Sequence, residues 1–170
     1  MTTNKETVAE AFAANFPGRL ELIDQNTILD GAHNVDKIRF LIRALNTKYK
    51  ILNTRYTLVV AFKKGKNWKK MLSLLVKNLP VKKIIATKFN APTDTGFFAA
   101  VEPSEIKEFL ISNLKFPISN VKVIENSLEA VFEALNTIQL SNYPSSQLTL
   151  VTGSLYLVGE ARTLWYLPEF

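Results

Sequence analysis

The sequence contains no cysteine and only one histidine, His33, among its 170 residues. The absence of cysteine excludes disulfide bonds and thiol chemistry. A zinc site would have only His33 and carboxylates as ligands, and no G-x-S-x-G motif surrounds any serine. We therefore predict no metal site built by this chain and no self-contained catalytic triad.

Long apolar runs and glycine-rich phosphate-binding motifs are also missing. No stretch approaches the roughly 20 apolar residues that a membrane-spanning helix needs. The N-terminal "MTTNKETVAEAFAANF" has an early acidic residue and no long apolar core, unlike a secretory signal. The sequence contains neither G-x-x-x-x-G-K-[ST] nor a G-x-G-x-x-G that follows a strand. These absences predict a cytoplasmic protein without a membrane partner.

The net charge is +6, and much of the excess lies in "FKKGKNWKK", where lysine occupies positions 63, 64, 66, 69 and 70. One interpretation is a solvated loop and helix face, which is the usual role of such a charge run. The other is a positive field that attracts a nucleotide or an acidic substrate. Trp68 is the only aromatic residue among these lysines, whereas single-strand binders interleave several, so we predict no nucleic-acid partner.

Strand-like and helix-like patterns alternate along the chain. Runs rich in Val, Ile, Thr and aromatic residues predict strands at 20–23, 27–30, 56–62, 82–89, 121–126 and 147–154. Apolar stripes at helical spacing predict four helices, through Ile38, Leu41, Ile42 and Leu45; Trp68, Leu72, Leu75 and Leu79; Ile106, Phe109, Leu110 and Leu114; and Leu128, Val131, Phe132 and Leu135. We expect each stripe to face the core.

This order of elements predicts an α/β fold. The runs at 56–62, 82–89 and 147–154 are nearly continuously apolar, which is typical of parallel strands covered on both faces. Only "DQN" separates the first two strands, so they are expected to form an antiparallel pair at one edge. We predict a Rossmann-like three-layer sandwich of about six mostly parallel strands with helices on both faces, over residues 16–170. Residues 1–15 lack a strand pattern and are interpreted as a tail or linker remnant.

Four residues are candidates for a site, because ligands of such sheets bind beyond the carboxyl ends of the strands. Asp30 ends a strand and could accept hydrogen bonds from a ribose, although Asp30 or Asn34 could equally cap the next helix. His33 lies in the same polar turn. Arg19 follows Pro17-Gly18 and could offer its planar guanidinium to a phosphate, or lie idle on the surface. Ser154 could hold an anion at a helix start, or simply cap that helix.

Four segments carry a resemblance to a known family: "FPGRLEL", "ILDGAHN", "LVVAFKKGKNWKKML" and "LVTGSLYLVGEAR". In this order, the chain from about Phe16 onward resembles the C-terminal domain of folylpolyglutamate synthase and of bifunctional dihydrofolate synthase, in the Mur ligase superfamily. The proline that usually follows the asparagine of the second segment is Val35 here. Lysines replace the acidic cluster of many relatives, and the loop "FNAPTDTGFF" lacks an arginine that they often carry.

The resemblance implies an ATP- and Mg²⁺-dependent ligase. It would join L-glutamate to the γ-carboxylate of a folate through an acyl phosphate. The phosphate-binding loop and metal ligands would belong to an N-terminal ATPase domain that these residues do not include. By motif matching, Arg19 would reach ATP phosphates, Asp30 would contact the nucleotide, His33 would be catalytic beside the reacting groups, and Ser154 would hold the incoming glutamate. The isolated chain would then be inactive; the rival is a non-catalytic module that binds a nucleotide or a protein.

Overall fold

The computed structural model describes residues 16–49, 53–90, 99–140 and 146–166. The predicted tail at 1–15 and most of the loop "FNAPTDTGFF" lie outside these residues. The strands are β1 (Glu21–Leu22), β2 (Thr27–Asp30), β3 (Arg55–Val60), β4 (Val81–Lys88), β5 (Val121–Asn126) and β6 (Gln147–Thr152). The α-helices are α2 (Val35–Tyr49), α3 (Trp68–Asn78), α4 (Pro103–Ser112), α5 (Ser127–Gln139) and α6 (Leu155–Arg162). A short 3₁₀ turn, Ile118–Asn120, precedes β5.

The strands form one sheet in the order β1-β2-β6-β3-β4-β5. Strand β1 is antiparallel to β2, and every other neighbouring pair is parallel. The predicted antiparallel edge pair and parallel interior are therefore confirmed. Because β6 is inserted between β2 and β3, the carboxyl end of β6 lies directly beside the carboxyl end of β2.

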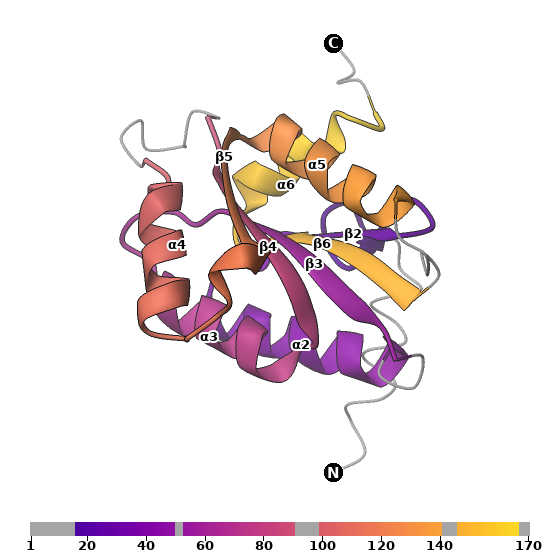
Figure 1. The fold of residues 1–170 in the computed structure, drawn as a ribbon. Helices are drawn as coiled ribbons and strands as arrows, with labels where there is room; N and C mark the ends of the chain where they lie inside the picture. The colour runs from indigo at the N-terminus through magenta and orange to yellow at the C-terminus, as the bar shows by residue number, and fades with distance from the viewer. Residues whose placement is uncertain (1–15, 50–52, 91–98, 141–145, 167–170) are drawn as a thin grey trace.

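Helices cover both faces of the sheet, which gives three layers (Figure 1). One core forms where α2, α3 and α4 pack against residues such as Ile28, Leu58 and Leu150. A second core forms where α5 and α6 pack on the opposite face, against Val59 and Val151. Strand β6 is buried along its whole length, as its nearly continuous apolar run predicts. The three-layer prediction is confirmed.

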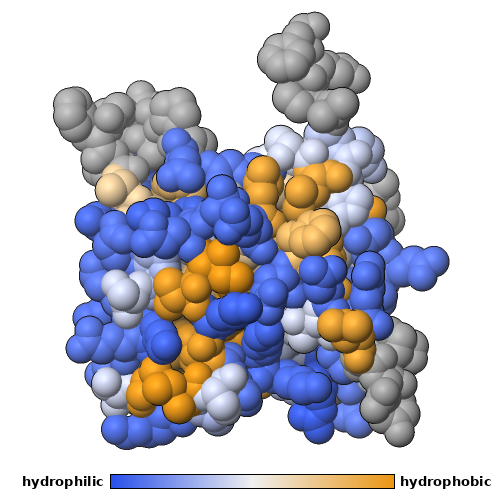
Figure 2. Space-filling model, turned by 45° about the horizontal axis from the view of Figure 1, so that its top comes forward, coloured by the Kyte–Doolittle hydropathy of each residue, from blue (hydrophilic) through white to orange (hydrophobic). Residues whose placement is uncertain are grey.

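The prediction for the fourth helical stripe was partly wrong. Val131 is buried in α5, but Leu128 is 36% exposed and Phe132 58% exposed. The buried face of α5 uses small residues instead, Ala130 and Ala134, which let the helix lie close to the sheet. The side chains of Leu128 and Phe132 therefore point outward and contribute apolar surface. On the face of the molecule drawn in Figure 2, apolar surface forms separate areas with hydrophilic surface between them.

No helix among the described residues is long and apolar enough to cross a membrane.

Candidate site at the carboxyl edge of the sheet

Two loops meet where β2 and β6 end. The strands are parallel neighbours, and Asp30 is the register partner of Thr152. A Cβ added at Gly31 would overlap the side chain of Leu155 and lie 3.4 Å from its Cα. The loop that carries Asp30 and His33 therefore packs directly against the turn that follows Ser154. The predicted grouping of these residues at one edge is present in the structure.

Arg19 reaches the same edge through a tight turn. Its N–H donates to the carbonyl of Phe16 at 3.1 Å, and Gly18 has a φ of 68°. Proline followed by a glycine with positive φ is the sequence of a type II turn. The N–H of Gly31 donates to the carbonyl of Gly18 at 2.8 Å, which ties this turn to the loop after β2. The Arg19 side chain is exposed and forms no ion pair among the described residues.

Asp30 supports the backbone on both sides of the site. It is 8% exposed, and its Oδ2 accepts the N–H of Leu20 at 2.9 Å while Oδ1 accepts that of Ala32, also at 2.9 Å. Burial raises the pKa of Asp30 above its ordinary 3.8; the two N–H groups and the charge of Arg19 offset part of this rise. Each carboxylate oxygen retains a further lone pair. Its contact with a nucleotide stays a prediction.

The raised pKa of Asp30 predicts a pH dependence of stability. The folded protein holds this proton more tightly than the unfolded chain does, so the stabilising contribution is complete below the unfolded value of 3.8. It is lost as the pH rises through the raised folded value. We expect wild-type stability to fall relative to that of Asp30→Asn across this acidic window, measured by urea unfolding from about pH 3 to pH 7. A pH-independent difference between the two proteins would contradict this.

His33 is held in one neutral tautomer. Its Nδ1 lies 2.8 Å from the carbonyl oxygen of Gly31, which can only accept, so Nδ1 carries the hydrogen. Nε2 is then the acceptor, and Lys37 Nζ donates to it at 3.2 Å. The helix-capping alternative is confirmed for Asn34, whose Oδ1 accepts the N–H of Lys37 at 2.9 Å. His33 itself is half-buried at the edge of the site.

Ser154 begins α6 as its N-cap. Its Oγ accepts the N–H of Tyr156 at 3.1 Å, so the capping alternative is confirmed here too. The residue is only 2% exposed. A ligand would therefore meet this turn mainly through the exposed residue that follows, Leu155, and the role of Ser154 in holding glutamate stays a prediction.

The lysine-rich loop also lies at this edge. It follows β3, which is the other neighbour of β6, and a Cβ added at Gly153 would lie 2.8 Å from the Phe62 ring. Lys64 and Lys66 are exposed, and Lys69 Nζ lies 5.6 Å from the centre of the Trp68 ring. Both interpretations of the cluster, a solvated face and an anion-attracting field, remain predictions.

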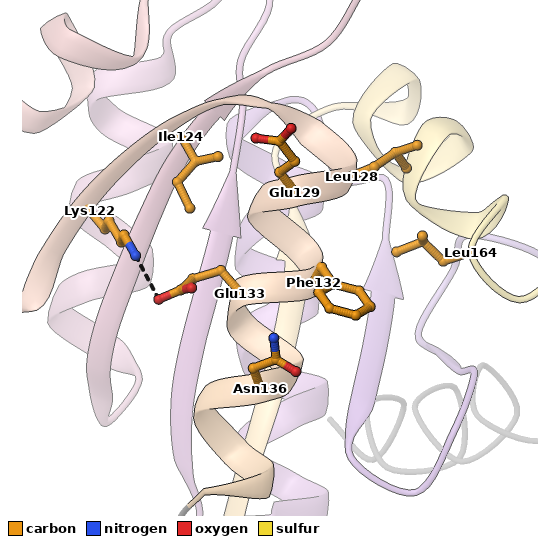
Figure 3. A pocket seen from close by; sticks show the side chains of 8 residues that line it. All are labelled: Lys122, Ile124, Leu128, Glu129, Phe132, Glu133, Asn136 and Leu164. Atoms are coloured by element: carbon orange, nitrogen blue, oxygen red, sulfur yellow. Dashed lines mark hydrogen bonds and ion pairs between the residues drawn. The ribbon is translucent and has the colours of Figure 1, made fainter.

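A separate hollow lies on the outer face of α5 (Figure 3). Leu128, Phe132 and Leu164 supply apolar lining, and Lys122 and Glu133 form an ion pair of 2.8 Å at its side. None of the four predicted site residues lines it. We therefore place the candidate site at the carboxyl edge of the sheet.

Two residues of the edge were missed by the sequence analysis. Lys37 could have been found, because it lies four positions after His33, a spacing that places both on one helical face. Glu21 could not, since its ion-pair partner, Arg162, is 141 positions away. Among the described residues no group of three or more His, Asp or Glu side chains is arranged to hold a metal ion.

The fold and the site define an α/β domain of the kind that binds ligands in loops beyond the carboxyl ends of parallel strands. A sequence profile of the family "Dihydrofolate synthetase, C-terminal domain" matches residues 19–164. The chain belongs to this family, and the resemblance inferred from the sequence is confirmed.

Individual relatives agree with this assignment. The chain is 30% identical to dihydrofolate synthetase of Saccharomyces cerevisiae over 168 residues, which is 93% of the chain and 37% of that protein. Its fold matches one part of Mycobacterium tuberculosis folylpolyglutamate synthase complexed with ADP and AMPPCP, with a TM-score of 0.72, 20% identity, and coverage of 91% of this chain and 33% of that one. A Yersinia pestis folylpolyglutamate synthase/dihydrofolate synthase complexed with AMPPNP and Mn aligns with a TM-score of 0.68 and 21% identity, over 89% of this chain and 32% of that one. The chain thus spans about a third of its relatives' length.

Proposed function

We propose that this chain is the C-terminal part of an ATP-dependent ligase that joins L-glutamate to the carboxyl group of dihydropteroate or of a folate. The observation that carries the proposal is the convergence of the Arg19 turn, the Asp30–His33 loop and the Ser154 turn at one edge, in a chain of the dihydrofolate synthetase family. The family and its yeast relative support dihydropteroate as an acceptor. Folylpolyglutamate synthases of the same fold support a folate acceptor.

Each residue of the edge has a role that fits this chemistry. ATP would supply the phosphoryl group that activates the carboxylate for attack by the amino group of glutamate. The exposed guanidinium of Arg19 would pair with phosphate oxygens and offset their charge. Asp30 would keep the two backbone segments in register around the nucleotide, and His33 would lie beside the reacting groups. No described cluster fits Mg²⁺, so we assign the metal no step on this chain.

The partner in this proposal is an N-terminal ATPase domain, since the chain covers 37% of its yeast relative. Two large apolar side chains flank the edge: Phe16 is 60% exposed and Leu155 is 53% exposed. Apolar surface of this kind beside a polar site is suited to burial against a second domain. Without that domain, the 170-residue chain is expected to bind ATP weakly and to give no folate-dependent ADP release.

The test is a ligation assay with the complete protein that contains these residues, using dihydropteroate and tetrahydrofolate as acceptors. Arg19→Ala is expected to lower kcat/KM for ATP about 100-fold, and His33→Ala to lower kcat by a similar factor. Arg39→Ala is the matched control, because Arg39 lies on the surface of α2 and its ion pair among the described residues is with the exposed Asp36. Wild-type rates in Arg19→Ala and His33→Ala would overturn the site assignment. The absence of ligation in the wild type would overturn the function.

A further inference from the structure

Arg162 is the last residue of α6 and of the segment "LVTGSLYLVGEAR", and it contacts a different element of the fold. Arg162 Nε is 3.3 Å from both carboxylate oxygens of Glu21. Glu21 is on β1, and it is only 8% exposed. The pair therefore joins the end of α6 to the first strand of the sheet. Arg162 also contacts Tyr166, whose ring centre lies 4.5 Å from its Cζ.

Glu21 also contacts the Arg19 turn, which comprises residues 16–19. Its Oε2 also accepts the N–H of Gly18 at 2.8 Å, immediately before Arg19. The carbonyl of Gly18 in turn accepts the N–H of Gly31, in the loop after β2. A continuous series of hydrogen bonds thus runs from α6, through a buried carboxylate, into both polar segments of the site.

Apolar packing fixes the same turn against the same helix. A Cβ added at Gly18 would lie 3.1 Å from Cγ1 of Val158, in the middle of α6. The turn therefore packs closely against the helix. Its position depends on α6 through two independent contacts, and the ion pair is the one that sets the direction of the backbone N–H.

The ion pair is a costly way to join two elements. A buried carboxylate must be matched by a cation and by hydrogen bonds, and removal of one partner leaves an uncompensated charge. Apolar side chains would hold β1 against α6 equally well. The geometry points to a different purpose: we infer that Glu21 and Arg162 are positioning residues that hold the Arg19 turn in the orientation in which it meets an anionic ligand. The identity of that ligand, a phosphate of ATP, rests on the proposed function.

Limited trypsin digestion of the 170-residue chain tests the positioning itself. Cleavage after Arg19 requires the turn to leave its place, because Leu20 is 4% exposed and its N–H is bonded to Asp30. In Arg162→Met and in Glu21→Gln, we expect cleavage after Arg19 to become about tenfold faster, with no change after the exposed Lys66. The double variant should be no faster than the faster single variant, because both changes break one unit.

Glu133→Gln provides the matched control. Glu133 on α5 pairs with Lys83 at 3.3 Å and with Lys122 at 2.8 Å, and Figure 3 shows the second pair. Neither pair includes a residue of the Arg19 turn, so the substitution removes ion pairs without removing a contact of the turn. This control should leave cleavage after Arg19 unchanged relative to cleavage after Lys66. Equal acceleration at both sites in Arg162→Met, or no acceleration at Arg19, would overturn the inference.

Ligation kinetics in the complete protein separate this inference from the proposed function. We expect Arg162→Met and Glu21→Gln to raise KM for ATP about tenfold and to change kcat less than about twofold, because they displace Arg19 without removing any reacting group. Faster cleavage after Arg19 with unchanged KM would keep the positioning role and reject ATP as the ligand. Unchanged cleavage would reject the positioning role, whatever the kinetics.

Discussion

Replacing Gly153 by alanine is expected to lower the free energy of unfolding by about 3–5 kcal/mol. Gly153 has a φ of 105°, a conformation that residues with a Cβ rarely adopt. The added Cβ would also overlap the carbonyl oxygen of Ala61, which is backbone and cannot rotate away, and would lie 2.8 Å from the ring of Phe62. The backbone strain and the steric overlap both destabilise the variant, because the turn before α6 packs against the residues that follow β3.

Gly159 offers a matched control on the following helix. A Cβ there would meet nothing within 4 Å, and the residue lies inside α6. Gly159→Ala is therefore expected to stabilise the protein by about 0.5–1 kcal/mol, through the higher helix propensity of alanine. Urea unfolding followed by circular dichroism measures both variants. Equal effects of the two substitutions would show that the Gly153 turn is not constrained as described.

The fold could be predicted from the sequence largely because its signals are local. The continuous apolar run of β6 and the short "DQN" connection before β2 each indicate one strand arrangement, and both arrangements are present. Helix α5 was harder, because only part of its stripe of large apolar residues faces the core. Ala130 and Ala134 are buried there instead of Leu128 and Phe132, and small residues give a weak periodic signal.

The site could be located from the sequence, but its supports could not. Asp30 ends β2 and Ser154 follows closely after β6, and the parallel arrangement brings the ends of these two strands together. The capping roles of Asn34 and Ser154 follow from local spacing. The bond from Asp30 to Leu20 and the pair between Glu21 and Arg162 join segments that only the folded chain makes neighbours. No spacing rule reveals such partners in a single sequence.

Replacing Asp30 by alanine is expected to lower the free energy of unfolding by about 2–4 kcal/mol. The carboxylate is buried, and it accepts the backbone N–H groups of Leu20 and Ala32. Alanine leaves both donors without an acceptor in a place that water reaches poorly. Leu20 also has a positive φ of 47°, so the hydrogen bond to Asp30 holds a residue in an unfavourable conformation. Equilibrium unfolding in urea at one fixed pH, used for the wild type and for every variant, measures the loss.

Asp30→Asn removes only one of the two hydrogen-bond acceptors that Asp30 provides. The amide oxygen can replace one carboxylate oxygen, but its NH₂ group faces the second N–H donor, so about half of the loss is expected to remain. Asp36→Ala is the control, since that side chain is 92% exposed and its pair with Arg39 lies on the surface; we expect a change within about 0.5 kcal/mol. A loss at Asp30 no larger than that at Asp36 would mean that the carboxylate does not hold the two segments. The proposed role of Asp30 would then be limited to contact with a ligand.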